Sequence, residues 1–287
     1  MEIMVIPNLY NKGKRRCKRR RGNIAKVTEN FNTINLFFNN INGLLSKRES
    51  LELIIKMEKP DLVALCETKL HLNSTFTIDG YETIKSNLKT GKEGILIAAK
   101  IGTFSSLDMI YQAENRNIMS VEVVYPKDSV NLVVVHGPQE GDPREVKENF
   151  YNNIKVEIER CISNNNRLII AGDLNAKMDL NGNKIEANSG NAMLLKTIIE
   201  MYNLQVINFQ KHTNGKWTRI QKKRGNETKS VLDYIIVDSN TVNLFKNTSI
   251  DESKIYTPYR IRTNNKIRSI VYSDHCSILT SIQIERG

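Results

Sequence analysis

Short apolar runs rich in β-branched residues recur along the chain after residue 30, and this pattern constrains the fold more than any other feature. Several runs follow one another with no helical segment between them, which argues against a purely parallel sheet with helices on both sides. Two layers of strands covered by helices fit this order, so we predict an α/β fold. The runs span residues 33–38, 61–66, 94–99, 118–124, 132–135, 168–171, 231–237 and 277–284.

Helical signals lie between these runs. Ser46-Lys47-Arg48-Glu49 has the pattern of a capping box, and Lys59-Pro60 stops the helix that follows it. Asp142-Pro143 indicates a second helix, with Asp as its cap and Pro in its first turn. The apolar spacing of residues 194–202 predicts a third. The polar stretches 181–191 and 251–269 are predicted as loops, and 210–230 as a surface loop or hairpin.

The length of 287 residues suits one large domain or two small ones, and 40% of the residues are hydrophobic. No apolar run approaches the roughly 18 residues of a membrane span, so we expect no membrane partner. The first ten residues lack the order of a signal peptide. The four cysteines are scattered, which predicts free thiols in a reducing compartment.

A strongly basic segment occupies residues 1–30. Residues 1–29 hold nine Lys and Arg against two Glu, a net +7 of the chain's +11. Like charges at this density resist packing, so we expect a disordered arm followed by one domain at 31–287. The cluster is typical of a nuclear-import or nucleic-acid-binding patch and predicts nuclear localisation, although a solvated tail without a partner is the alternative. The arm residues expected to bind nucleic acid are Arg15, Arg16, Lys18, Arg19, Arg20 and Arg21.

Acidic, amide or imidazole side chains stand at the ends of apolar runs in segments 39–44, 66–68, 172–175 and 273–275. Together they can supply metal ligands, phosphate donors and a base, the set that water needs to attack a phosphodiester. In the third segment Gly172 lets the chain turn, so that Asp173 and Asn175 can point together into a cleft. Asp173 can orient or deprotonate water and Asn175 can donate to a phosphate oxygen; a simple Asx turn is the alternative.

The other segments offer ligands and donors of the same kind. Glu67 ends an apolar run, where its carboxylate is an oxygen ligand of the type that Mg²⁺ prefers, or simply an exposed strand-end Glu. Asn40 and Asn42 alternate on a strand end and can line the same cleft, or form only a turn. Asp274 beside His275 offers a ligand next to a donor with a near-neutral pKa, or a surface turn.

Two further candidate site residues lie within or directly after predicted strands. Asp233 lies inside the run 231–237, where a carboxylate is costly unless it is paired. A histidine is the natural partner because a carboxylate fixes its tautomer, whereas an edge-strand Asp facing water is the alternative. His136 follows the run 132–135 and can protonate a leaving oxygen, or be a capped strand-end histidine.

Trp217 lies within a basic stretch of the chain. Aromatic and basic groups together suit nucleic-acid contact, whereas a core Trp with a solvated charged face is the alternative. The basic neighbours that we expect to bind nucleic acid are Arg219, Lys222, Lys223 and Arg224, with Lys216 also nearby.

The order and spacing of these motifs resemble the endonuclease/exonuclease/phosphatase superfamily, and within it the apurinic-type endonuclease domains of non-LTR (LINE-type) retrotransposons. The resemblance runs from about Thr33 to Ile284. It rests on Asn40-Ile41-Asn42-Gly43-Leu44, Cys66-Glu67-Thr68, Gly172-Asp173-Leu174-Asn175, Ser273-Asp274-His275 and the segment Trp217-Thr218 followed by Val231-Leu232-Asp233-Tyr234.

The resemblance implies a four-layer α/β/β/α sandwich of the deoxyribonuclease type, with two mixed sheets and its site where they meet. It implies Glu67 and Asp274 on Mg²⁺, with Mn²⁺ as a substitute and Asn40 nearby. Asp173 would orient the water and Asn175 would hold the phosphate. His275 would contact the phosphate while paired to Asp233.

Two positions depart from the retrotransposon pattern. His136 stands where such endonucleases usually carry Tyr, although pancreatic-type deoxyribonucleases carry a catalytic His there. Asn42 stands where an acidic residue is usual, which leaves the number of metals open. The expected activity is a Mg²⁺-dependent DNA endonuclease that leaves a 3′-hydroxyl nick, with DNA as partner and no obligate protein partner. The alternatives are another phosphoesterase of the superfamily, such as a general nuclease or a lipid or inositol phosphatase, and a non-catalytic nucleic-acid-binding relic.

Overall fold

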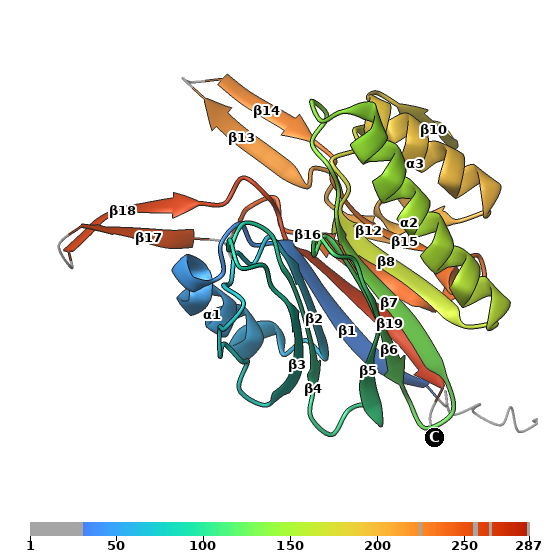
Figure 1. Ribbon diagram of the computed structural model, residues 1–287, viewed down its shortest axis with the longest axis horizontal. Coiled ribbons are helices and arrows are strands. Elements are labelled where there is room, and N and C mark those ends of the chain that lie inside the picture. Colours follow the sequence, from blue (N-terminus) through green and yellow to red (C-terminus); the bar gives the residue numbers. More distant parts are fainter. Residues whose placement is uncertain (1–30, 224–225, 255–257, 264–265, 286–287) are drawn as a thin grey trace, which may run out of the picture. The chain divides into compact units, whose positions relative to one another are not determined.

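Two β-sheets lie face to face, with helices on their outer sides (Figure 1). This computed structural model describes residues 31–223, 226–254, 258–263 and 266–285. The chain divides between Asn30 and Phe31 into two units, and the helices and strands described here belong to the second unit. The predicted basic arm is outside the described residues. Among those described, no helix is long and apolar enough to cross a membrane.

The first sheet has seven strands and is mixed. Its parallel pairs are β1 with β2 and β12 with β16, and its other neighbours run antiparallel. In spatial order the strands are β12 (Thr213–Asn214), β16 (Phe245–Ile250), β19 (Ile278–Glu285), β1 (Phe31–Asn40), β2 (Leu62–Cys66), β4 (Ile95–Lys100) and β3 (Tyr81–Ser86).

The second sheet has six strands and is also mixed, since only β7 and β8 pair in parallel. In spatial order the strands are β11 (Gln205–Val206), β15 (Asp233–Val237), β8 (Arg167–Asp173), β7 (Ser129–His136), β6 (Ile118–Val124) and β5 (Ser106–Gln112). The described helices are α1 (Arg48–Glu58), α2 (Arg144–Ser163) and α3 (Gly190–Met201), with 3-10 turns η1 (Leu45–Lys47), η2 (Ile207–Phe209) and η3 (Val242–Leu244).

Within the described residues, three separate hydrophobic clusters hold the layers together. The largest lies between the sheets, where Phe38 and Ala64 of the first sheet share a cluster with Val134 of the second. A second cluster joins the other face of the six-stranded sheet to α2 and α3, and a third joins α1 to the other face of the seven-stranded sheet. The layers are therefore α/β/β/α, which confirms the predicted sandwich with two mixed sheets.

The first residues of two helices differ from the sequence prediction. The Ser46 hydroxyl donates to the Gly43 carbonyl instead of capping α1, which begins only after the 3-10 turn η1. α1 ends as predicted, with Lys59 in left-handed backbone conformation. α2 begins at Arg144, one residue later than predicted, because the Asp142 carboxylate accepts from the backbone N–H of Gln139 in the preceding loop.

Hairpins occupy two stretches that were predicted to be loops. β9 (Met178–Asn181) pairs with β10 (Lys184–Ala187), and β17 (Pro258–Thr263) pairs with β18 (Lys266–Tyr272). Their sequences are largely polar and lack the apolar runs that indicate a buried strand. The stretch 210–230 does contain the hairpin that was predicted as one possibility, formed by β13 (Arg219–Lys223) and β14 (Asn226–Ser230).

Candidate active site

Strand register places three of the predicted residues side by side on the six-stranded sheet. Asp173 is the last residue of β8, and it is aligned with His136 on β7 and with Asp233 on β15. Residues aligned on neighbouring strands point to the same face of a sheet. The pairing of β8 with β7 on one side and with β15 on the other thus brings three distant positions in the sequence into one row of functional groups.

Asn40 joins this row to the other sheet. It ends β1 and is aligned with Cys66, the last residue of β2, so that Glu67 follows immediately beside it. The Asn40 side-chain amide donates to Oε1 of Glu67 at 2.8 Å and to Oδ2 of Asp173 at 2.9 Å. One buried amide therefore holds a carboxylate from each sheet at the place where the sheets meet.

His275 is paired with Asp233, as the carboxylate inside a β-branched run suggested. Nδ1 of His275 lies 3.0 Å from Oδ2 of Asp233, and Nε2 lies 3.7 Å from Oδ2 of Asp173. Asp233 is fully buried, and its backbone N–H donates to the hydroxyl of Thr218 at 3.0 Å. The imidazole is thus fixed through Nδ1, while Nε2 faces the carboxylate at the end of β8.

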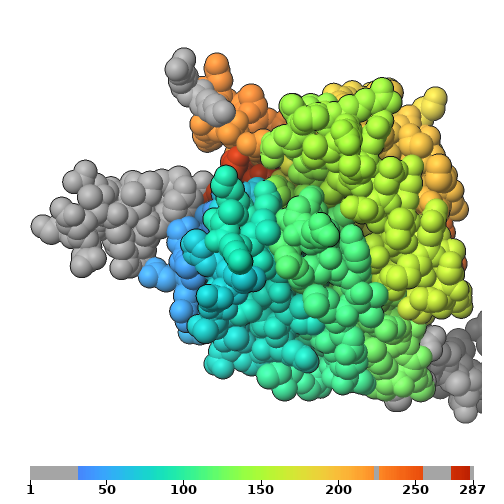
Figure 2. Space-filling model, in the orientation of Figure 1, coloured from blue at the N-terminus to red at the C-terminus, as the bar shows by residue number. Residues whose placement is uncertain are grey.

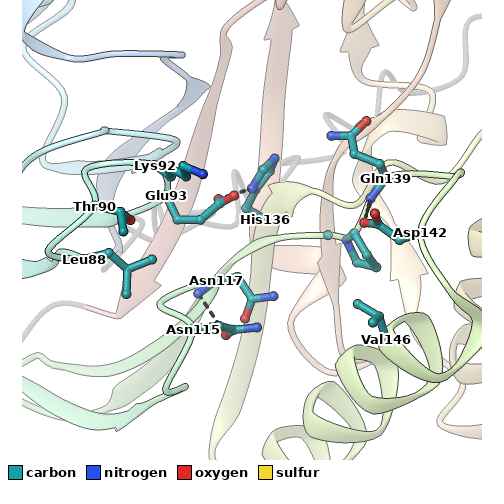
Figure 3. Close-up of a pocket in the computed structure, with 12 residues that line it drawn as sticks. Leu88, Thr90, Lys92, Glu93, Asn115, Asn117, His136, Gln139, Asp142 and Val146 are labelled. Atoms are coloured by element: carbon teal, nitrogen blue, oxygen red, sulfur yellow. Dashed lines mark hydrogen bonds and ion pairs between the residues drawn. The ribbon is translucent and has the colours of Figure 1, made fainter.

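His136 has a matching arrangement on the other side of Asp173, built on a residue that the sequence did not reveal. Its Nδ1 donates to Oε2 of Glu93 at 2.6 Å (Figure 3). Its Nε2 lies 3.2 Å from Oε1 of Glu67. Glu93 precedes Gly94 and the start of β4, 43 residues before His136 in the chain. No local pattern marks Glu93, because its partner is fixed only when the two sheets pack.

These contacts form one continuous chain of polar groups across the site. The order is Glu93, His136, Glu67, Asn40, Asp173, His275 and Asp233. Each histidine is held through Nδ1 by one carboxylate and turns Nε2 toward another.

The negative field of the carboxylates dominates the electrostatics of the site. Burial alone would lower the pKa of both histidines, but carboxylates outweigh it: Glu67 and Glu93 raise the pKa of His136 to about 10, and Asp233 and Asp173 raise that of His275 to about 9. The pKa of Glu67 is well below its usual range despite burial, because His136 and Asn40 stabilise its charged form.

The loop after β8 is held rigidly. The Asn175 backbone N–H donates to Oδ1 of Asp173 at 2.9 Å, and its side-chain amide donates to the Gly137 carbonyl at 2.8 Å. The sharp turn comes at Asn175, which has a φ of 47°, and not at Gly172 as predicted. Gly172 is needed for another reason: a Cβ there would lie 2.3 Å from Cγ2 of Val135 and 2.4 Å from its carbonyl oxygen.

The ammonium group of Lys69 links the loop after β1 to the loop after β2. Nζ of Lys69 lies 2.5 Å from Oδ1 of Asn42 and 3.1 Å from Oε2 of Glu67. Asn42, Glu67 and Lys69 all have positive φ values, 42°, 49° and 53°. Such backbone strain in non-glycine residues is typical of functional sites, because the surrounding structure must enforce it.

The donor set fits a divalent cation. Ligand atoms of Glu67, His136 and Asp173 all lie within 4.8 Å of one another, as do those of Asp173, Asp233 and His275. Carboxylate oxygens are the ligands that Mg²⁺ prefers, and the field that raises the pKa of both histidines also attracts a cation. Asp274, predicted as a ligand, is in neither group: its Oδ2 accepts from Nε of Arg219 at 2.8 Å. Arg219 competes for the carboxylate, which no local sequence pattern predicts.

The residues predicted to bind nucleic acid lie in several places. Trp217 is half-buried against the core beneath α2 and α3, with Nζ of Lys216 4.6 Å from the centre of its ring. Lys222 is exposed on β13, in the hairpin that projects at the top of Figure 2 (orange). The described structure therefore separates Trp217, which packs, from Lys222, which faces solvent. The Lys223 side chain, Arg224 and the six arm residues are outside the described part of the chain.

The fold packs two mixed sheets face to face, and the chain of polar groups lies where the sheets meet. This combination defines a class of proteins, the metal-dependent phosphoesterases and nucleases. The model of the Endonuclease/Exonuclease/phosphatase family matches residues 33–275. The chain belongs to that family, as the motifs led us to expect.

Solved structures show the same fold. The endonuclease domain of TRAS1, a telomere-specific non-LTR retrotransposon, is 17% identical, covers 88% of this chain and 100% of its own, and has a TM-score of 0.62. The AP endonuclease LMAP from Leishmania major is 16% identical over 88% of each chain, with a TM-score of 0.66. The 3′ phosphatase NExo from Neisseria, solved with a product DNA hairpin, is 16% identical over 87% of this chain and 99% of its own, with a TM-score of 0.67. The fold shared with a retrotransposon endonuclease domain agrees with the resemblance that the motifs indicated.

Proposed function

We propose that this chain is a Mg²⁺-dependent DNA endonuclease of the retrotransposon type, which hydrolyses one phosphodiester to leave a 3′-hydroxyl. The observation that carries the proposal is the continuous chain of groups from Glu93 to Asp233, complete with two oriented histidines and two carboxylates that share the Asn40 amide. A binding relic would be under no constraint to keep all of these contacts. The similarity to the TRAS1 endonuclease domain and to AP endonucleases supports DNA as the substrate.

The residues have distinct roles in this proposal. Asp173, held on both oxygens by Asn40 and Asn175, orients and deprotonates the attacking water. His275 keeps its proton because of Asp233, and donates to the phosphate oxygen that gains charge. His136, fixed by Glu93, protonates the leaving oxygen. Glu67 and Asp173 would hold the divalent cation, which would supply charge stabilisation to the phosphate, and Mn²⁺ would substitute for Mg²⁺.

The basic arm and the β13–β14 hairpin extend the proposal to substrate binding and location. The arm's +7 charge and exposed Lys222 suit a DNA backbone, because each neutralised phosphate releases counterions. The same arm has the composition of a nuclear-import signal, and this supports our proposal that the protein acts in the nucleus. Import is tested by fusing residues 1–30 to a fluorescent cytosolic protein, and cytosolic retention of the fusion argues against it.

Supercoiled plasmid tests the activity directly. The purified chain should convert plasmid to the open circle with Mg²⁺ or Mn²⁺ and not with EDTA, and DNA polymerase should extend the nick because its end is a 3′-hydroxyl. Release of phosphate from 3′-phosphorylated DNA or from an inositol phosphate without nicking would assign the chain to another phosphoesterase activity. Tight DNA binding with no hydrolysis under any of these conditions would assign it to a binding relic.

A further inference from the structure

Asn191, in the first turn of α3, joins the loop that follows β7 to the loop that follows β8. Its side-chain amide donates to the Pro138 carbonyl at 2.8 Å and to the Asn175 carbonyl at 3.2 Å. These carbonyls lie two residues after His136 and two residues after Asp173, respectively. One amide group of a helix therefore connects the two loops that leave the site.

The two carbonyl acceptors require a side chain with two hydrogens to donate. Asn191 is fully buried, and its amide supplies both hydrogens from one nitrogen. A serine has one hydroxyl hydrogen and a leucine has none, so neither can serve both carbonyls. Among the described residues, Oδ1 of Asn191 has no hydrogen-bond partner. The buried amide of Asn191 is therefore used as a donor, and both of its donations go to loops of the site.

The start of α3 is itself fixed in place. Oε1 of Glu140 accepts from the Gly190 N–H at 2.9 Å, and its Oε2 accepts from the Asn191 N–H at 3.2 Å. A carboxylate is favourable there because the first N–H groups of a helix have no partner within the helix. α3 also packs on the outer face of the six-stranded sheet through Leu195 and Ile198 (Figure 1). The position of Asn191 is thus set by a packed and capped helix.

Asn175 is the residue on which both donations of Asn191 act. Its φ of 47° is a left-handed conformation, which a residue other than glycine adopts only when its surroundings enforce it. Its side-chain amide donates to the Gly137 carbonyl at 2.8 Å, and Gly137 immediately precedes Pro138, whose carbonyl Asn191 holds. That contact uses one N–H of the Asn175 amide, and the other N–H can donate to a phosphate oxygen.

We propose that Asn191 is a positioning residue for the hydrolysis: it holds the carbonyls of Asn175 and Pro138 so that the Asn175 amide faces the scissile phosphate. The inference rests on the proposed function for the reaction itself. A donor that is fixed before the substrate arrives needs no reorganisation during the reaction, and a displacement of about 1 Å can cost about 10²-fold in rate. Loss of Asn191 should therefore lower kcat and leave the KM for DNA nearly unchanged.

Hydrogen exchange in the metal-free protein tests the contact without any reaction. In Asn191→Leu of the full-length chain in EDTA, the Asn175 N–H should exchange at least about tenfold faster than in the wild type, because the loop opens locally. The Ile170 N–H, in the middle of β8, serves as the reference for global stability. Asn131→Leu is the matched control, since it removes another fully buried amide, near the start of β7, whose Oδ1 accepts from Nη2 of Arg160 at 3.3 Å. It should leave the exchange of Asn175 relative to Ile170 unchanged.

A double-mutant cycle on plasmid nicking shows through which residue Asn191 acts. Asn191→Leu should lower kcat by about tenfold or more and change KM by less than about twofold. Asn191→Ser keeps one donor, should lie between the Leu variant and the wild type, and provides the test if the Leu variant does not fold.

Asn175→Gly completes the cycle, because it removes the phosphate donor and accepts the positive φ without strain. In the Asn175→Gly background, Asn191→Leu should lower kcat by less than about a further twofold, since the group that it positions is already gone. Asn131→Leu should have the same effect on kcat in both backgrounds, because it acts independently of Asn175.

The outcomes separate the role of Asn191 from the proposed function. Unchanged exchange at Asn175 in both Asn191 variants overturns the proposal, and so do rate losses of Asn191→Leu and Asn175→Gly that multiply in the double variant. A wild type that cuts no DNA with Mg²⁺ or Mn²⁺ contradicts the proposed function; faster exchange at Asn175 then still supports the contact, and unchanged exchange rejects it. A wild type that nicks plasmid while both Asn191 variants keep its kcat supports the function and rejects the positioning role.

Discussion

Asp173 is the best-fixed residue of the site. Its two oxygens accept from the Asn40 amide and the Asn175 backbone N–H, its strand aligns it with His136 and Asp233, and only 1% of its surface is exposed. A carboxylate held in this way loses little freedom when it binds water or a cation, and such preorganisation is the main source of catalytic power in enzyme sites.

Removing either of two central groups should stop catalysis and leave the fold intact. Asp173→Asn keeps the shape of the side chain without its charge, and His275→Ala removes the donor beside it. We expect each variant to nick supercoiled plasmid at least about 10²-fold more slowly, because a positioned acid, base or donor contributes that much. Asp79→Asn, an exposed carboxylate, is the control. Turnover near that of the wild type in both variants, with unchanged thermal melting, would remove these residues from the mechanism.

Glu93 should control the protonation of His136. The pKa of His136 is raised from 6.5 to about 10, so its charged form stabilises the metal-free fold fully below pH 6.5, and this contribution is lost as the pH rises toward 10. In Glu93→Gln the pKa of His136 should fall, so this contribution to stability should be smaller and its loss should be complete at a lower pH. NMR titration of the His136 ring in EDTA measures the shift, with Glu82→Gln on β3 as the control. An unchanged titration in Glu93→Gln would show that Glu93 does not set the pKa of His136, and that Glu67 and Asp173 suffice to raise it.

At the scale of elements, β8 is the strand on which the site depends. It lies between β7 and β15 in the six-stranded sheet, and its last residue is Asp173. Because Gly172 has no side chain, the backbones of β7 and β8 can approach each other closely just before Asp173. The polar chain therefore depends on a contact between backbones as well as on the functional groups.

Gly172→Ala should separate these two strands. The new Cβ would lie 2.4 Å from the carbonyl oxygen of Val135, which must move, and overpacking of this kind typically costs about 1–3 kcal/mol. Urea denaturation measures the loss of stability, and nicking should fall as well because His136 is aligned with Asp173. Gly141→Ala is the control, since a Cβ there meets nothing within 4 Å. Equal stability of the two variants would contradict the predicted contact.

At the scale of the whole molecule, charge is distributed unevenly between the arm and the domain. Deleting residues 1–29 removes +7 of the net +11 and none of the groups of the site. The slope of log K against log salt for duplex DNA should become shallower by about 0.9 for each phosphate that the arm neutralises, while nicking at low salt persists. An unchanged slope, measured by fluorescence anisotropy, would show that the arm does not touch DNA.

Metal binding should stabilise the folded domain as a whole. A ligand that binds only the native state adds about 2.7 kcal/mol to the free energy of unfolding when its concentration is 100 times its Kd. Adding Mg²⁺ to the EDTA-treated protein should therefore raise the Tm, and Glu67→Gln should lose most of this rise. A Tm that Mg²⁺ raises equally in wild type and Glu67→Gln would place the cation elsewhere.

The sequence by itself determined the most apolar buried strands and the main polar groups of the site. Apolar runs such as 168–171 specify buried strands through local composition. The polar residues that follow such runs, including Asp173 and Glu67, therefore lie at the ends of strands. The buried carboxylate of Asp233 required a partner for reasons of desolvation alone. Such features depend on neighbours in the chain, which a sequence displays directly.

Apart from the pair of Asp233 and His275, only the tertiary structure decided which polar groups of the site contact one another. Glu93 reaches His136 across 43 residues, and Arg219 takes Asp274 across 55, because packing of the two sheets and of the β13 hairpin sets those distances. Gly172 is required by the backbone of a neighbouring strand, and not by its own turn. Which of several partners binds a carboxylate depends on their positions in space, so local sequence does not predict it.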